Sequence, residues 1–115
     1  MDIQTYVNKE EGMSRVLNNA KIYRKMLDMF LNSTEFQTLE DAFVSGDYKQ
    51  GEAASHSIKG VAGNLSFPVL FKESNTLMEQ YRGEGPKEET IAAYRDALTN
   101  TIVAVKELIV QMDNA

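Results

Sequence analysis

The feature that most constrains the fold is a long amphipathic segment near the C-terminal end of the chain. It extends from about Lys87 to Met112 and carries apolar residues at helical spacing. The apolar positions are Ile91, Tyr94, Leu98, Ile102, Val105, Leu108, Ile109 and Met112. At 1.5 Å per residue, a helix of this length spans roughly 39 Å. Because a helix with one apolar side must bury that side, the segment predicts a bundle in which shorter helices pack along it.

The rest of the chain also shows helical periodicity, and no segment alternates as a strand does. We expect further helices at about 10–17, 20–31, 34–45, 47–66 and 68–81. Thr34 and Gln37 resemble a capping box at the start of the third of these. Gly46 is a typical helix stop, and Pro68 can open the following helix at its first position. The short connections favour antiparallel neighbours in a single all-α domain of residues 1–115.

The composition argues against several classes of function. The chain has no cysteine, which excludes disulfides and thiolate chemistry, and a single histidine argues against a transition-metal site. A net charge of −5, from 17 acidic and 12 basic residues, argues against a nucleic acid or an anionic membrane as partner. No apolar run reaches the roughly 18 residues that cross a bilayer, and the N-terminus lacks the order of a signal peptide. We therefore expect a cytoplasmic protein. The chain also shows no glycine-rich loop that would bind ATP.

His56 is the only histidine in the chain. On a helical wheel its neighbours Ala54, Ile58, Val61 and Leu65 form an apolar stripe, which predicts the side of the helix that faces the core. His56 projects roughly 170° away from the centre of that stripe. The imidazole is therefore expected to point into water, directly opposite the core.

Gly60 and Gly63 share the side of the helix on which His56 lies. Glycine inside a helix costs about 1 kcal/mol relative to alanine. Gly51 lies on the core side, where it can allow two helices to pack closely, but this explanation does not extend to two exposed glycines. We interpret Gly60 and Gly63 as clearance that lets another protein approach the imidazole.

Lys59 follows His56 by about one helical turn. A neutral imidazole is nucleophilic, and a neighbouring ammonium both disfavours a second positive charge and can neutralise a phosphoryl group. A histidine and a lysine at this spacing are, by themselves, more typical of an ordinary solvated helix surface. The exposed glycines and the lack of any other histidine favour phosphate chemistry instead. Ser55 and Ser57 flank the ring and are expected to contribute only local surface.

The segment from Ala54 to Leu65, ASHSIKGVAGNL, resembles the histidine-containing phosphotransfer (HPt) domain of bacterial phosphorelays. The resemblance extends upstream, where residues 10–15 and 23–30 look like the first two helices of that family, and it covers about residues 8–110. One departure is Ser66, where the family often has glycine. The resemblance implies an antiparallel up-down four-helix bundle with one or more additional short N-terminal helices.

The resemblance also implies a function and its partners. His56 would accept a phosphoryl group on its exposed ring nitrogen, with Lys59 beside the phosphoryl oxygens and Gly60 giving access. Donor and recipient would be aspartates of response-regulator receiver domains, one of which can belong to a hybrid sensor histidine kinase. Those domains would bring Mg²⁺, so this chain needs no cofactor or metal of its own. It would act as a monomeric phosphoryl carrier rather than as a stand-alone enzyme.

Three alternatives remain open from the sequence. The first is the phosphoacceptor domain of a chemotaxis-type kinase, which carries a similar string, although Asn64 and Leu65 look more like the phosphorelay branch. The second is a helical interaction module that binds receivers or kinases without carrying phosphate. The third is a hydrolytic enzyme with His56 as general base, which lacks a nucleophile and an orienting group nearby. Met1 favours a free-standing carrier over a piece of a hybrid kinase, and the pathway and the direction of transfer are not encoded in the sequence.

Overall fold

All 115 residues are described in the computed structural model, and they form seven α-helices and no strand. The helices are α1 (Ile3–Tyr6), α2 (Lys9–Ser14), α3 (Ala20–Leu31), α4 (Glu35–Ser45), α5 (Tyr48–Leu65), α6 (Pro68–Tyr81) and α7 (Glu88–Asp113). The predicted all-α class is confirmed. No helix of the chain is both long enough and apolar enough to span a membrane.

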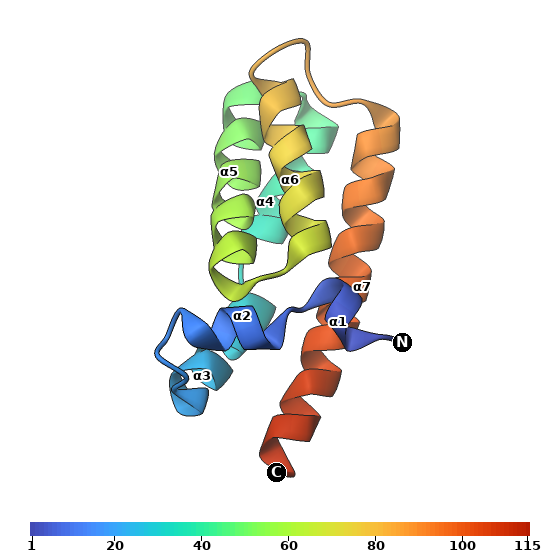
Figure 1. Cartoon of the computed structure of the whole chain (residues 1–115). Coiled ribbons are helices and arrows are strands. Elements are labelled where there is room, and N and C mark those ends of the chain that lie inside the picture. The colour runs from blue at the N-terminus through green and yellow to red at the C-terminus, as the bar shows by residue number, and fades with distance from the viewer.

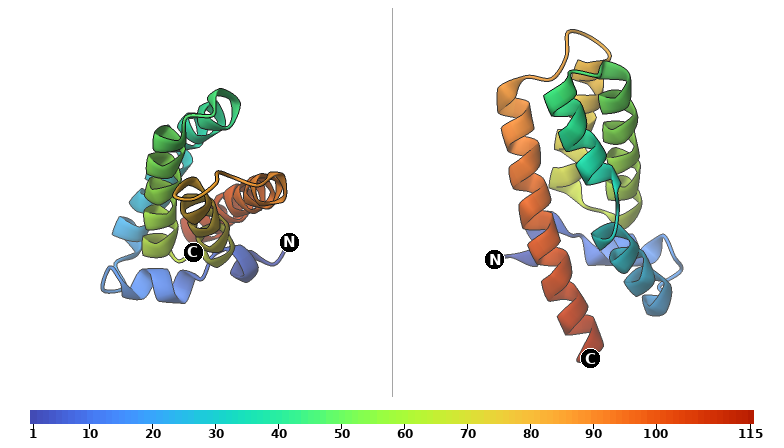
Figure 2. Two further views of the ribbon diagram at one scale, coloured as in Figure 1. Left: turned by 90° about the horizontal axis from the view of Figure 1, so that it is seen from above. Right: turned by 180° about the vertical axis from the view of Figure 1, so that it is seen from behind.

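The four longer helices of the C-terminal part, α4 to α7, lie side by side and alternate in direction (Figure 1). The most extensive contact is between α5 and α6, and α4 packs on α5 while α6 packs on α7. Side chains connect α4 with α7: the rings of Phe43 and Tyr94 lie 6.0 Å apart, and Arg95 donates to Glu40 at 2.7 Å. Below them, α3 packs on the lower half of α7. The short helix α1 packs on α7 and α6, and α2 packs on α5 (Figures 1 and 2).

The buried line of α7 agrees with the predicted stripe only in part: Tyr94, Val105 and Leu108 are buried as predicted, while the other buried positions are small or polar residues outside that stripe. The fully buried line runs through Tyr94, Ala97, Thr101, Ala104, Val105 and Leu108. Predicted core residues such as Ile91, Leu98 and Ile102 are only partly buried and pack against the core from its edges. The small residues explain the rotation, because alanine and threonine let the backbone of α7 approach its neighbours more closely than larger side chains would.

Two predicted helix ends differ from the structure. The helix predicted to reach Leu17 ends at Ser14, and Leu17 itself has a φ of 53° and is 92% exposed. Thr34 adopts helical dihedral angles and makes no side-chain cap, so the predicted capping box is wrong. Instead, the Ser33 hydroxyl accepts from the backbone N–H of Glu35 at 3.2 Å. The stop at Gly46 is confirmed by its left-handed φ of 73°.

Gly51 and Gly60 occupy the same helix, α5, but in opposite environments. Gly51 is buried, and a Cβ added there would overlap the ring of Tyr81 on α6. Gly60 is exposed, and a Cβ added there would meet nothing within 4 Å. Gly51 therefore sets the distance between α5 and α6, whereas Gly60 has no packing role.

We predict that alanine at these two positions changes stability in opposite directions. Gly60→Ala should stabilise the fold by about 0.5–1 kcal/mol, because only the helix propensity changes. Gly51→Ala should destabilise it by about 1–3 kcal/mol, because the Tyr81 ring must move. Urea unfolding of both variants measures these differences. An increase in stability for Gly51→Ala would contradict the close approach of α5 and α6.

Candidate functional site

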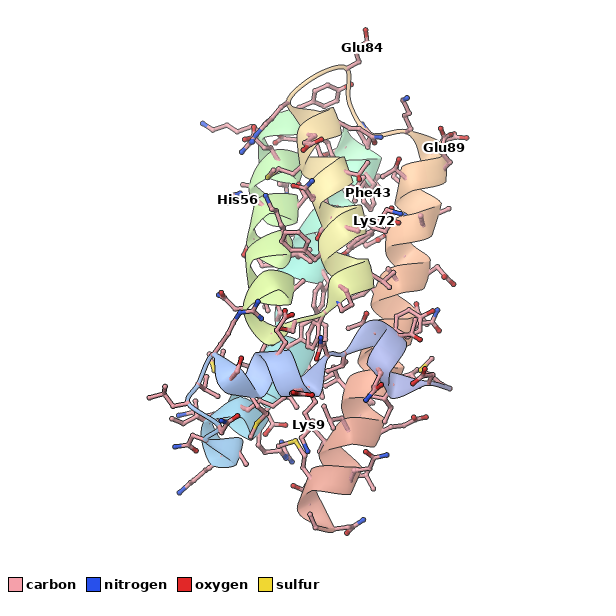
Figure 3. The ribbon with its side chains drawn as sticks, in the orientation of Figure 1. Lys9, Phe43, His56, Lys72, Glu84 and Glu89 are labelled. Atoms are coloured by element: carbon pink, nitrogen blue, oxygen red, sulfur yellow. The ribbon has the colours of Figure 1, made fainter.

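His56 lies at the middle of α5 and is exposed, as the wheel predicts (Figure 3). A contact with α6 restrains the orientation of its ring: Nδ1 lies 3.2 Å from the Sδ atom of Met78. Met78 is only 4% exposed, so the sulfur belongs to a packed side chain. The other ring nitrogen, Nε2, makes no hydrogen bond within the chain. The site therefore presents one engaged and one available imidazole nitrogen.

Lys59 lies on α5 toward α6 and is half-buried. Its Nζ is 5.7 Å from the centroid of the Phe71 ring, which fits a cation–π contact. Lys59 takes part in none of the salt bridges of the chain, so no carboxylate neutralises its charge. This leaves an uncompensated cation one turn from His56.

The carboxylate nearest to His56 along α5 is already paired. Glu52 lies one turn before His56, and its Oε1 accepts from Nε of Arg82 at 2.9 Å. Arg82 follows the end of α6, so this ion pair connects the two helices at the far end of the site from Lys59. Arg82 therefore offsets the charge of Glu52, the only acidic residue of α5.

The two exposed glycines of the sequence prediction have different surroundings. Gly60 is exposed with open space above it, which fits the predicted clearance. Gly63 is half-buried, and a Cβ there would lie 3.3 Å from Cε2 of Phe71. We expected that packing within the chain does not explain Gly63, and this is wrong. The lack of a side chain at Gly63 makes room for the Phe71 ring, which contacts Lys59.

Two other expectations about α5 are also wrong. Ser55 is fully buried, because it faces α6, and its hydroxyl donates to the backbone carbonyl of Gly51 at 2.7 Å. Val61 is 38% exposed, because it lies where the connection between α3 and α4 leaves α5 partly uncovered. Ser57 is half-buried beside the same connection. The other members of the predicted stripe, Ala54, Ile58 and Leu65, are buried as expected.

Sequence reasoning did not identify Met78 as part of the site. Met78 is separated from His56 by 22 positions and lies on another helix. One signal was available: Ser74, Met78 and Tyr81 follow one another at helical spacing, and all three are buried in the structure. This places Met78 on the face of α6 that meets α5, but not opposite His56 in particular.

Ser66 ends α5 in a left-handed conformation, with φ of 64°, a conformation that glycine adopts without cost. Its hydroxyl donates to Oε1 of Glu11 at 2.9 Å and also accepts from Arg15, both on or next to α2. The hydroxyl of Tyr23 donates to the carbonyl of Leu65 at 3.0 Å. These bonds hold the turn without a glycine, so the departure at Ser66 leaves the end of the His56 helix intact.

No group of three or more histidine, aspartate or glutamate side chains is arranged to hold a metal ion. A hollow of about 320 Å³ lies beside the end of α5, with Glu11, Arg15 and Ser66 among its lining residues. Its charged groups already bind one another. We therefore locate the candidate site at His56 and not in this hollow.

The comparison with protein families identifies the chain. Residues 25–115 match the family model described as Hpt domain, which covers most of the chain, and the chain belongs to this family. Domains of this family carry out histidine phosphotransfer in two-component signalling, where they interact with receiver domains and kinases. The match does not include the segment before residue 25, so the resemblance of residues 10–15 stays a prediction. A comparison with curated proteins finds no match, and neither does a comparison with solved structures.

The bonds from Ser66 and Arg15 hold the pKa of the Glu11 carboxyl below its usual range. A lowered pKa in the folded state means that the stabilisation is complete above the usual pKa of glutamate and is lost as the pH falls through the lowered value. We predict that wild type has the larger free energy of unfolding at about pH 6, and that the difference from Glu11→Gln shrinks as the pH falls below the usual glutamate pKa of about 4.3. The difference is small, because the carboxylate is exposed. Urea unfolding at several pH values measures it, and a constant difference would contradict the assignment.

Proposed function

We propose that this chain is a phosphoryl carrier of a phosphorelay, in which His56 accepts a phosphoryl group from an aspartate of one receiver domain and passes it to another. The observation that carries the proposal is an exposed imidazole whose Nε2 is available, beside the uncompensated charge of Lys59. Membership of the Hpt domain family supports the reaction type. The alternating packing of α4 to α7 supports a four-helix up-down bundle with additional N-terminal helices.

The chemistry requires a nucleophile and a site that tolerates negative charge. The lone pair of Nε2 forms a bond to phosphorus while the bond from phosphorus to the aspartate oxygen breaks, and the aspartate leaves as a carboxylate. Lys59 is one turn away, and its ammonium would move from the Phe71 ring to the phosphoryl oxygens. The partner supplies Mg²⁺. We further propose that the carrier acts as a monomer, in the cytoplasm with its receivers.

We predict that His56→Gln abolishes phosphorylation. The purified chain is incubated with a phosphorylated receiver domain and Mg²⁺, and acid-labile label on the chain is measured. A parallel incubation with a histidine kinase domain and ATP tests the chemotaxis-type alternative, which predicts label in that arm alone. Label that persists in His56→Gln would refute His56 as acceptor. A wild-type chain that no receiver of a panel labels would refute the phosphorelay carrier, and one that is unlabelled in the kinase arm as well would leave the interaction module.

We predict that Gly60→Gln slows transfer by roughly tenfold or more, because a side chain there meets the approaching receiver domain. The fold is retained, since the substitution has open space and raises helix propensity. Gly83→Gln, in the turn that follows α6 and not on the helix of His56, is the matched control and should transfer at the wild-type rate. Rates come from the time course of label on the chain. An unchanged rate in Gly60→Gln would contradict the clearance role.

A further inference from the structure

The contact between His56 and Met78 is the one hydrogen-bonding contact of the imidazole within the chain. The polar groups on the adjacent turn of α5 are engaged elsewhere: the Ser55 hydroxyl bonds to backbone carbonyls, and Glu52 binds Arg82. The sulfur of Met78, 3.2 Å from Nδ1, is held by the buried face of α6. The orientation of the ring thus depends on a thioether.

A thioether sulfur accepts a hydrogen bond weakly and donates none. The contact is therefore favourable only when Nδ1 carries a proton. In a neutral imidazole the other nitrogen, Nε2, then holds the lone pair, and Nε2 is the nitrogen without a partner. We propose that Met78 is a positioning residue that selects this tautomer of His56 and directs the Nε2 lone pair outward. The role in transfer rests on the proposed function, while the effect on the tautomer does not.

The assignment fits the balance of the transfer step. When the Nε2 lone pair bonds to phosphorus and the aspartate carboxylate leaves with the other electron pair, Nδ1 keeps its proton. The ring becomes positively charged, and the bond from Nδ1–H to the sulfur persists. No proton has to leave the site in either direction. Because the thioether is neutral, it orients the ring without the strong charge pairing that a carboxylate would add, so the ring can still leave in the onward transfer.

The tautomer of His56 tests the proposal directly. Long-range correlation of ring protons with ¹⁵N, recorded on the full chain, reports which nitrogen carries the proton. In Met78→Leu, which conserves the side-chain volume, the fraction protonated at Nδ1 should fall. In Met78→Gln, whose amide oxygen is a stronger acceptor, it should be retained. Met29→Leu, at a 64% exposed position on α3, is the matched control.

The transfer rate supplies the second readout. We expect Met78→Leu to slow phosphorylation by a receiver about fivefold, as for the loss of one weak hydrogen bond, and Met78→Gln to restore the rate. If Met78→Leu has the wild-type tautomer, the proposal is overturned, whatever its rate. If the tautomer shifts but the wild-type chain accepts no label from any receiver, then the proposed function fails while the contact with Met78 stands. If Met78→Leu is unfolded by circular dichroism, Met78→Gln alone decides: a loss of Nδ1 protonation there overturns the proposal.

Discussion

The packing of α5 against α6 is the interaction on which the rest of the site depends. Gly51, near the start of α5, admits one aromatic ring of α6 against the helix, and Gly63, near its end, admits another. These two contacts fix the separation of the helices on both sides of His56. The sulfur of Met78 reaches the imidazole only because the helices are this close. The contact between His56 and Met78 therefore depends on Gly51 and Gly63, although neither glycine contacts the imidazole.

The electrostatics of the site follow from the pairing of its neighbours. The chain as a whole is acidic, with a net charge of −5, but its negative charge is not concentrated at His56. Glu52 is bound by Arg82, and Lys59 contacts an aromatic face instead of a carboxylate. Because Lys59 is in no ion pair, its ammonium can move to an incoming phosphoryl group without first breaking a salt bridge. The net charge of the chain therefore does not describe α5 near His56, where the one carboxylate is paired and Lys59 is not.

Helical periodicity predicted much of the fold, and it failed where the answer depends on a neighbouring helix. The exposure of His56 and the freedom at Gly60 follow from angular position on α5 alone, and both were predictable. A helical wheel places residues relative to the stripe of their own helix, and it does not show where the adjacent helices lie. The predictions for Ser55 and Val61 were wrong for this reason. Ser55 is covered by α6, and Val61 is exposed at a hollow beside α3. The contact with Met78 joins residues on different helices, and no local pattern encodes such a pair.

Gly51 and Gly60 lie in one helix but differ in their effect on stability. At Gly51 the helix loses backbone propensity but gains the packing of a buried ring, so the cost is offset within the folded chain. At Gly60 nothing in the structure offsets the cost, because no atom comes near the missing side chain. A residue that lowers stability and improves no packing within the chain is expected where a surface is shaped to bind another molecule. The place of Gly60 near an imidazole with one available nitrogen is consistent with the proposed transfer, in which a receiver domain has to approach His56 closely.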